Sequence, residues 1–162
     1  MPDFLDKIEF KPVWEQISDA DSIEVRNLWV KEGALTNAEQ IAVRLREVAI
    51  LVKHKENGIL GLSTVRTLTL DKFNKNKFYE YRCFISSAYR APALDTKLLV
   101  ETKRYFERHN KANAVGLIMV IENEMIKQNW TKAVWPGADM VFAGYTSEGH
   151  HIRLSYFKKA KI

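Results

Sequence analysis

The chain has 162 residues, a mass of 18.8 kDa and a formal net charge of +5, and its length suits one domain spanning residues 1–162. Its 46% hydrophobic and 28% charged residues exclude a disordered protein, and the one cysteine, Cys83, excludes a disulfide framework and a multi-cysteine zinc site. No apolar run reaches the roughly 18–20 residues of a membrane span, and the acidic start is unlike a signal or transit peptide. We therefore expect a cytoplasmic protein with no membrane partner.

The first third of the chain predicts one strand and two helices, at residues 8–14, 21–32 and 36–47. Asp21 or Ser22 can cap the first helix. Thr36 and Glu39 have the spacing of a capping box, which predicts the start of the second helix.

The rest of the chain predicts strands at 48–52, 59–70, 78–87, 114–121, 140–145 and 152–157, and a long helix that ends near residue 109. Asp95 or Thr96 is expected to begin that helix. Cys83 falls on the inner face of strand 78–87, so we expect a buried small side chain rather than a nucleophile.

Charge is distributed unevenly along the sequence. Residues 1–40 contain 4 basic and 9 acidic side chains, whereas residues 41–162 contain 21 and 11. A segregated basic excess attracts polyanions, either nucleic acid or the phosphates of a nucleotide-like cofactor. A solvated surface with no such partner explains the same counts, so charge alone does not choose between them.

The loop after strand 78–87 carries a resemblance to a known family. It reads Ile-Ser-Ser-Ala-Tyr-Arg-Ala-Pro-Ala-Leu-Asp over residues 85–95. This loop and the order of elements resemble the GCN5-related N-acetyltransferases (GNAT family), in which an aliphatic residue at the end of the fourth strand precedes an Arg or Gln and a glycine-containing turn. Ile85 takes the place of the aliphatic residue and Arg90 that of the motif arginine, while Ala93 and Asp95 stand where small residues or glycines are usual.

The resemblance covers nearly the whole chain and implies its fold class. We expect a mixed α/β (α+β) fold with a mostly antiparallel central sheet of about six to seven strands. Three to four helices would flank this sheet, and a V-shaped split would separate the fourth and fifth strands.

The resemblance also implies an activity, an acyl-CoA-dependent N-acyltransferase with acetyl-CoA or another acyl-CoA as substrate. An amine would attack the thioester directly, and backbone N–H groups of the loop and the helix start would hold the coenzyme A pyrophosphate. The cofactor-binding residues that it implies are Phe84, Ile85, Ser86, Arg90, Ala91, Ala93, Asp95, Thr96 and Asn123.

The loop departs from the family pattern, which keeps an alternative open. Neither glycine is present, Pro92 lacks an N–H, and Asp95 brings a negative charge unless it only caps the helix. An ordinary strand–turn–helix would have the same sequence. The alternative function is therefore a catalytically degenerate module of the same fold that binds nucleic acid or a protein.

The resemblance leaves the acid and base of the reaction to be identified. Asn123 matches a family asparagine, but Trp130 stands seven residues later where a tyrosine usually protonates the thiolate, and an indole does not ionise usefully. Tyr145 or Tyr81 could replace that tyrosine. Glu80 is the candidate base, the alternative being that it pairs with a cross-strand Lys or Arg.

The remaining motifs predict no further site. His150 and His151 are adjacent, so on a strand their rings would point to opposite faces, and we expect no metal site. The amine acceptor is unknown. The surplus of basic residues after residue 40 is compatible with an acceptor amine that is linked to nucleic acid. The closing hairpin could extend a sheet across a homodimer, although nothing in the sequence requires it.

Overall fold

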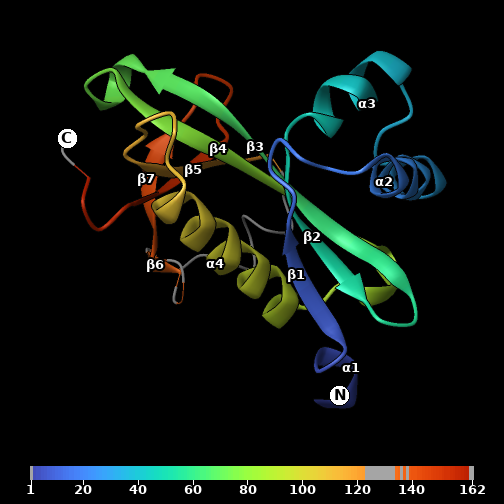
Figure 1. The fold of residues 1–162 in the computed structure, drawn as a ribbon. Helices are drawn as coiled ribbons and strands as arrows, with labels where there is room; N and C mark the ends of the chain where they lie inside the picture. The colour runs from blue at the N-terminus through green and yellow to red at the C-terminus, as the bar shows by residue number, and fades with distance from the viewer. Residues whose placement is uncertain (1, 123–133, 136, 138, 161–162) are drawn as a thin grey trace. The chain divides into compact units, whose positions relative to one another are not determined.

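The computed structural model describes residues 2–122, 134–135, 137 and 139–160 (Figure 1). The helices are α1 (Pro2–Leu5), α2 (Asp19–Lys31), α3 (Ala38–Leu45) and α4 (Pro92–Arg108), with short 3-10 turns η1 (Asp71–Phe73) and η2 (Ser87–Tyr89). The strands are β1 (Ile8–Pro12), β2 (Val48–His54), β3 (Gly58–Leu70), β4 (Asn76–Ile85), β5 (Gly116–Ile121), β6 (Val134–Trp135), β7 (Met140–Tyr145) and β8 (His151–Tyr156). Neighbouring strands follow the order β1-β2-β3-β4-β5-β8-β7-β6.

The chain forms two compact units. Unit 1 comprises residues 1–65 and 83–102, and unit 2 comprises residues 66–82 and 103–162. Three elements are divided between the units: β3, β4 and α4 each have one part in unit 1 and the other part in unit 2. A single domain over residues 1–162 remains a prediction.

Unit 1 is built on the antiparallel pairs β1–β2 and β2–β3 and on two helices that lie side by side (Figure 1). Helix α2 begins at Asp19, capped by Ser18, and α3 begins at Ala38, capped by Asn37. Both caps therefore differ from the predicted ones, because a serine or asparagine nearer the actual helix start accepts the N–H bond. The buried core consists of Val13, Val25, Trp29, Ile41, Val48, Leu51, Ile59 and Leu62.

Asp21 is a buried residue of unit 1 that does not cap α2. Its carboxylate lies 2.8 Å from Nζ of Lys53 on β2 and 3.2 Å from Nζ of Lys11 on β1. Burial by itself would raise the pKa of Asp21, but the hydrogen bonds from Lys53 and Lys11 outweigh it and lower the pKa. Asp21 thus ties the first turn of α2 to both strands.

The first part of α4 is docked in unit 1 through buried hydroxyl groups. Thr102 donates a hydrogen bond to the carbonyl of Leu98 at 2.8 Å, and the hydroxyl of Ser63 on β3 lies 2.8 Å from that of Thr102. Because the threonine proton is already used, Ser63 is the donor of the second bond. Leu98 and Thr102 lie on the inner face of this helix, where both are fully buried.

Unit 2 contains the parallel strand pair β4–β5, followed by antiparallel β8, β7 and β6. The parallel register covers two residue pairs, Tyr79 with Leu117 and Glu80 with Ile118. This short register agrees with the expected split between the fourth and fifth strands. The mixed, mostly antiparallel fold is therefore confirmed, and β6 is a two-residue strand that the sequence did not predict.

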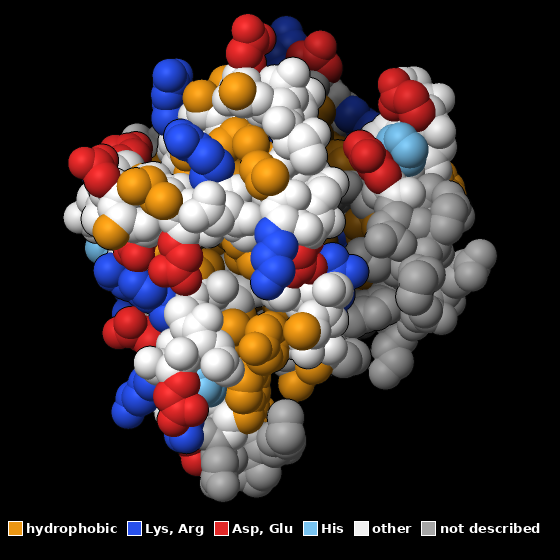
Figure 2. All heavy atoms as spheres, turned by 90° about the vertical axis from the view of Figure 1, so that its right-hand side faces the viewer, with side chains coloured by type: hydrophobic (Ala, Val, Ile, Leu, Met, Phe, Trp, Pro, Cys, Tyr) orange, Lys and Arg blue, Asp and Glu red, His pale blue; other side chains and the backbone are white. Residues whose placement is uncertain are grey.

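Cys83 and a face of mixed charge lie at the surface of the molecule. Cys83 is exposed rather than buried, because the cover over this face of β4 is interrupted at Cys83, between the buried Tyr81 and Ile85. The face turned to the viewer in Figure 2 mixes acidic and basic side chains, with apolar ones exposed between them. No helix of the described residues is long and apolar enough to cross a membrane.

Candidate functional site

The stretch of residues 84–96, from the end of β4 to the first turns of α4, lies within unit 1 and contains eight of the nine predicted cofactor residues. Helix α4 begins at Pro92, three residues before the predicted start at Asp95, and the N–H of Asp95 donates to the carbonyl of Ala91 at 3.1 Å. Proline suits the first helical position, since its φ angle is already helical and the missing N–H is not needed there. The proline thus begins the helix instead of disrupting the loop.

Arg90 holds the loop against the end of β4. Its Nε donates to the carbonyl of Ile85 at 2.9 Å, and its guanidinium carbon lies 5.8 Å from the centre of the Phe84 ring. The structure therefore brings together three residues that the motif implied. The bond from Nε and the contact with the Phe84 ring together restrict the guanidinium.

Glu32 is a residue of this loop region that sequence reasoning missed. Its carboxylate accepts hydrogen bonds from the hydroxyl of Ser86 and, at 2.8 Å, from the backbone N–H of Ser87. The bonds from Ser86 and Ser87 lower the pKa of Glu32, and the charge of Arg90 adds to this effect. No local signal predicts the contact, because Glu32 follows α2 and lies 54 residues from Ser86 in the sequence.

The first turn of α4 presents a second carboxyl group. Burial raises the pKa of Asp95, and the nearby charge of Arg90 partly opposes the shift. Ala91 and Ala93 are exposed, and Thr96 is half-buried. The negative charge of Asp95 is the feature of this loop that opposes phosphate binding, and burial disfavours its ionised form.

The predicted base, Glu80, belongs to unit 2 and is buried there. Its Oε1 lies 2.9 Å from Nη2 of Arg82 and its Oε2 lies 3.2 Å from Nη2 of Arg66 on β3. Both oxygens therefore contact a guanidinium, which is the pairing considered as the alternative to a catalytic role. A role for Glu80 as the base remains a prediction.

The predicted acid, Tyr145, is an exposed residue at the end of β7 in unit 2. Its ring meets those of Phe142 and His151 edge-on, and its carbonyl lies 3.5 Å from Nζ of Lys72. These partners are not shared with Glu80. Asn123 and Trp130, the other residues of this prediction, lie outside the described residues.

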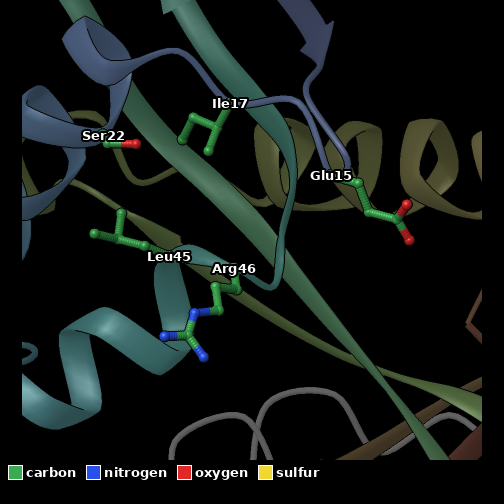
Figure 3. A pocket seen from close by; sticks show the side chains of 5 residues that line it. All are labelled: Glu15, Ile17, Ser22, Leu45 and Arg46. Atoms are coloured by element: carbon green, nitrogen blue, oxygen red, sulfur yellow. The ribbon is translucent and has the colours of Figure 1, made fainter.

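A hollow of about 380 Å³ lies elsewhere in unit 1. It is lined by Glu15, Ile17, Ser22, Leu45 and Arg46. Figure 3 shows that the Glu15 carboxylate and the Arg46 guanidinium point in different directions. None of the predicted cofactor residues lines this hollow. Among the described residues, no group of three or more His, Cys, Asp or Glu side chains could hold a metal ion.

Comparison with known proteins gives matches only at the level of structure. No family model and no curated protein sequence matches the chain. A ribosomal-protein-S5-alanine acetyltransferase from Vibrio fischeri superposes with a TM-score of 0.64 at 12% identity, covering 96% of both chains. A GNAT-family acetyltransferase from Listeria monocytogenes gives 0.59 at 16% identity, covering 91% of this chain and 94% of the other.

The chain has the GNAT fold. A third structure, Arabidopsis thaliana NAA60 in complex with acetyl-CoA, gives a TM-score of 0.57 at 11% identity over 93% of this chain and 98% of that one. The fold predicted from the loop and the order of elements is therefore confirmed. Strand β4 is the fourth strand in chain order and α4 is the 17-residue helix that follows it, while the cofactor-binding roles of Ile85 and Arg90 remain predictions.

Proposed function

We propose that the protein is an acyl-CoA-dependent N-acyltransferase that uses acetyl-CoA or a related acyl-CoA. The observation that carries the proposal is the conformation of the segment between β4 and α4. Arg90 is fixed on the carbonyl of Ile85 beside the first turn of a 17-residue helix, in a chain with the GNAT fold. A helix start and a fixed guanidinium together favour an anionic ligand such as a pyrophosphate.

The contacts of the loop support its capacity to hold anionic oxygen. The Ser86 hydroxyl and the Ser87 N–H already bind the ionised carboxylate of Glu32. A polar group with that geometry would also bind a phosphate oxygen. The missing glycines remain a departure, but Ala91 and Ala93 are exposed and their side chains are small.

The proposed reaction is a direct transfer. The amine nitrogen of the acceptor attacks the thioester carbonyl carbon, the new C–N bond forms, and the C–S bond breaks. A backbone N–H near Ile85 would stabilise the developing oxyanion. Glu80 would receive the proton that the amine loses, and Tyr145 would supply the proton that the departing thiolate takes up. For Glu80 to act, one of its two guanidinium contacts must give way to the acceptor.

The second candidate function is a binding module that has lost catalysis. Two features favour it, the absence of both motif glycines and a concentration of positive charge in unit 2. Such a module would keep the fold and bind nucleic acid or a protein. Cofactor binding separates the two candidates, since a degenerate loop would no longer hold coenzyme A.

Calorimetric titration with acetyl-CoA tests the proposal. We expect saturable binding that is weakened in Arg90→Gln and unchanged in Arg26→Gln, which removes an exposed arginine from α2 of the same unit. Absence of detectable binding at millimolar acetyl-CoA would overturn the acyltransferase proposal.

A further inference from the structure

Unit 2 concentrates cations at one end of its strands. The parallel strands β4 and β5 begin at that end, and the antiparallel strand β8 finishes there, since Gly116 is paired with Tyr156. The N–H of Val115 donates to the carbonyl of Lys77 at 2.8 Å, and the N–H of Phe157 donates to the carbonyl of Val115 at 2.9 Å. These bonds place the start of β4, the residue before β5 and the residue after β8 side by side.

The end of α4 joins the same group of segments. The hydroxyl of Tyr79, near the start of β4, donates to Oδ1 of Asn110 at 3.1 Å and accepts from the N–H of Ala112 at 3.3 Å. The side chain of Asn110 also bonds the N–H and the carbonyl of Ala114, at 2.8 Å and 2.7 Å. The turn between α4 and β5 is therefore fixed against β4.

Seven exposed cations lie on these joined segments. Lys72 contacts the carbonyl of Tyr145, and we call the other six the basic end. They are Lys75, Lys77, Arg108, Lys111, Lys158 and Lys159. The three segments 72–78, 108–115 and 156–160 contain no Asp or Glu. Of the two flanking carboxylates, Glu107 lies 3.8 Å from Nζ of Lys103 on the preceding turn of α4, and Asp71 stands at the start of η1.

The spacing of the basic end suits a repeated anion. Neighbouring strands are about 4.8 Å apart, so Lys77 and Lys158, separated by one strand, are about 10 Å apart along the sheet edge. Nucleic acid presents one phosphate charge per strand about every 3.4 Å of helix axis, so several lysines can each meet a different phosphate. An isolated phosphate would satisfy only one or two of them.

We propose that the basic end is a docking surface for the phosphodiester backbone of a nucleic acid. The contacts are made to phosphates rather than to bases, so the surface binds without a strong sequence preference. The proposal does not rest on acyl transfer, whose ligand is assigned to the loop of unit 1. Where both hold, the surface would bring a nucleic-acid-linked acceptor to the enzyme.

The test uses the full chain and fluorescence anisotropy, with a short DNA duplex and a short RNA hairpin as probes. With about five phosphates contacted, raising the salt concentration from about 50 to 200 mM should weaken binding by about 10²–10³-fold. The variant Lys77→Gln/Lys111→Gln/Lys158→Gln should bind at least about tenfold more weakly, with a shallower salt dependence. The matched control Arg26→Gln/Lys31→Gln/Lys55→Gln removes the same charge from exposed positions of unit 1 and should bind as the native chain does.

Each other outcome overturns the proposal. Failure of both probes to bind at low salt excludes the nucleic acid, and equal weakening of the two triple variants excludes the basic end as the surface. Displacement of the probe by polyglutamate as effectively as by unlabelled nucleic acid would identify an acidic protein as the better partner. Thermal unfolding of both variants shows whether each is folded, and an acetyl-CoA titration of the native chain reports on the proposed function independently.

Discussion

The two units of the molecule differ in the sign of their charge surplus and in where their charged side chains lie. Unit 1 contains 10 basic and 13 acidic residues, whereas unit 2 contains 15 and 7. In unit 1 key carboxylates have internal partners, Asp21 between two lysines and Glu32 on the loop donors. In unit 2 the buried Glu80 is also paired, but much of the cationic surplus is exposed at the basic end.

This difference separates two kinds of recognition. A fixed guanidinium beside a helix start suits one ligand with a defined geometry, while a row of flexible lysines suits a repeated charge. The comparison predicts that changes in unit 1 alter cofactor binding and stability, and that changes at the basic end of unit 2 alter nucleic-acid binding alone. The experiments below test it from the largest expected effect to the smallest.

The largest expected effect comes from Glu80→Gln, which removes the proposed base of unit 2. We expect kcat to fall by about 100-fold, because a general base typically contributes about 10²–10⁴-fold, with little change in KM. Glu148→Gln, an exposed change in the same unit, is the control. A loss of stability in urea with kcat unchanged per folded molecule would instead show that Glu80 only holds Arg66 and Arg82.

Asp21→Asn tests how far unit 1 depends on its buried carboxylate. The variant leaves Lys11 and Lys53 facing an uncharged amide, so the free energy of unfolding should fall by about 2 kcal/mol, less than for a fully buried pair because both lysines are partly exposed. Asp19→Asn, at an exposed position of the same helix turn, should have a smaller effect. Equal effects in urea unfolding would contradict a specific role for Asp21.

The pH dependence of stability provides a second test of the same residue. The lowered pKa of Asp21 means that its contribution is fully present above the ordinary aspartate pKa of about 3.9 and is lost as the pH falls through the lower folded value. In strong acid, the free energy of unfolding of the native chain should therefore no longer exceed that of Asp21→Asn. An unchanged difference in unfolding free energy across that range would contradict the assignment.

Arg90→Gln tests the loop of unit 1. Loss of a charge-assisted bond costs about 1.5–3 kcal/mol, so the Kd for acetyl-CoA should rise by at least about tenfold while nucleic-acid binding stays unchanged. Calorimetry and anisotropy measure the two quantities on one preparation. If nucleic-acid binding weakened equally, the two kinds of recognition would not be separate.

The smallest effect is expected from Asp95→Asn, and it is a gain. The raised pKa of Asp95 shows that its ionised form is disfavoured in the folded chain, so the variant should be more stable above the ordinary aspartate pKa. Removing the charge should also tighten acetyl-CoA binding by about threefold, corresponding to less than about 1 kcal/mol. Weaker binding in the variant would instead mean that Asp95 contacts the cofactor.

Sequence patterns predicted the strands and the long helix because the apolar residues of a buried face recur at the spacing of a strand or a helix. Residues such as Leu98 and Thr102 repeat at helical spacing and are buried as expected. Helix starts were less predictable, since several polar residues near Asp19 and Ala38 could each act as a cap. Cys83 was placed wrongly because alternation indicates a face of a strand but not how far that face is covered.

The candidate site was predictable only where its contacts are local. Arg90 meets Ile85 five residues away, and a motif can record that spacing. The contacts of Glu32 with Ser86 and of Glu80 with Arg66 join segments distant in the sequence. Nothing in a single sequence marks such pairs, because their proximity results from the packing of whole elements.

The contact of Glu32 with the loop couples ligand binding to the end of α2. An anionic ligand that takes both the Ser86 hydroxyl and the Ser87 N–H must displace the carboxylate, which releases a tether between the end of α2 and the segment after β4. By thermodynamic linkage, whatever holds that carboxylate elsewhere must strengthen binding of the anion by the same factor. A cation that engages Glu32, such as a protonated amine, would therefore bind cooperatively with the ligand of the loop.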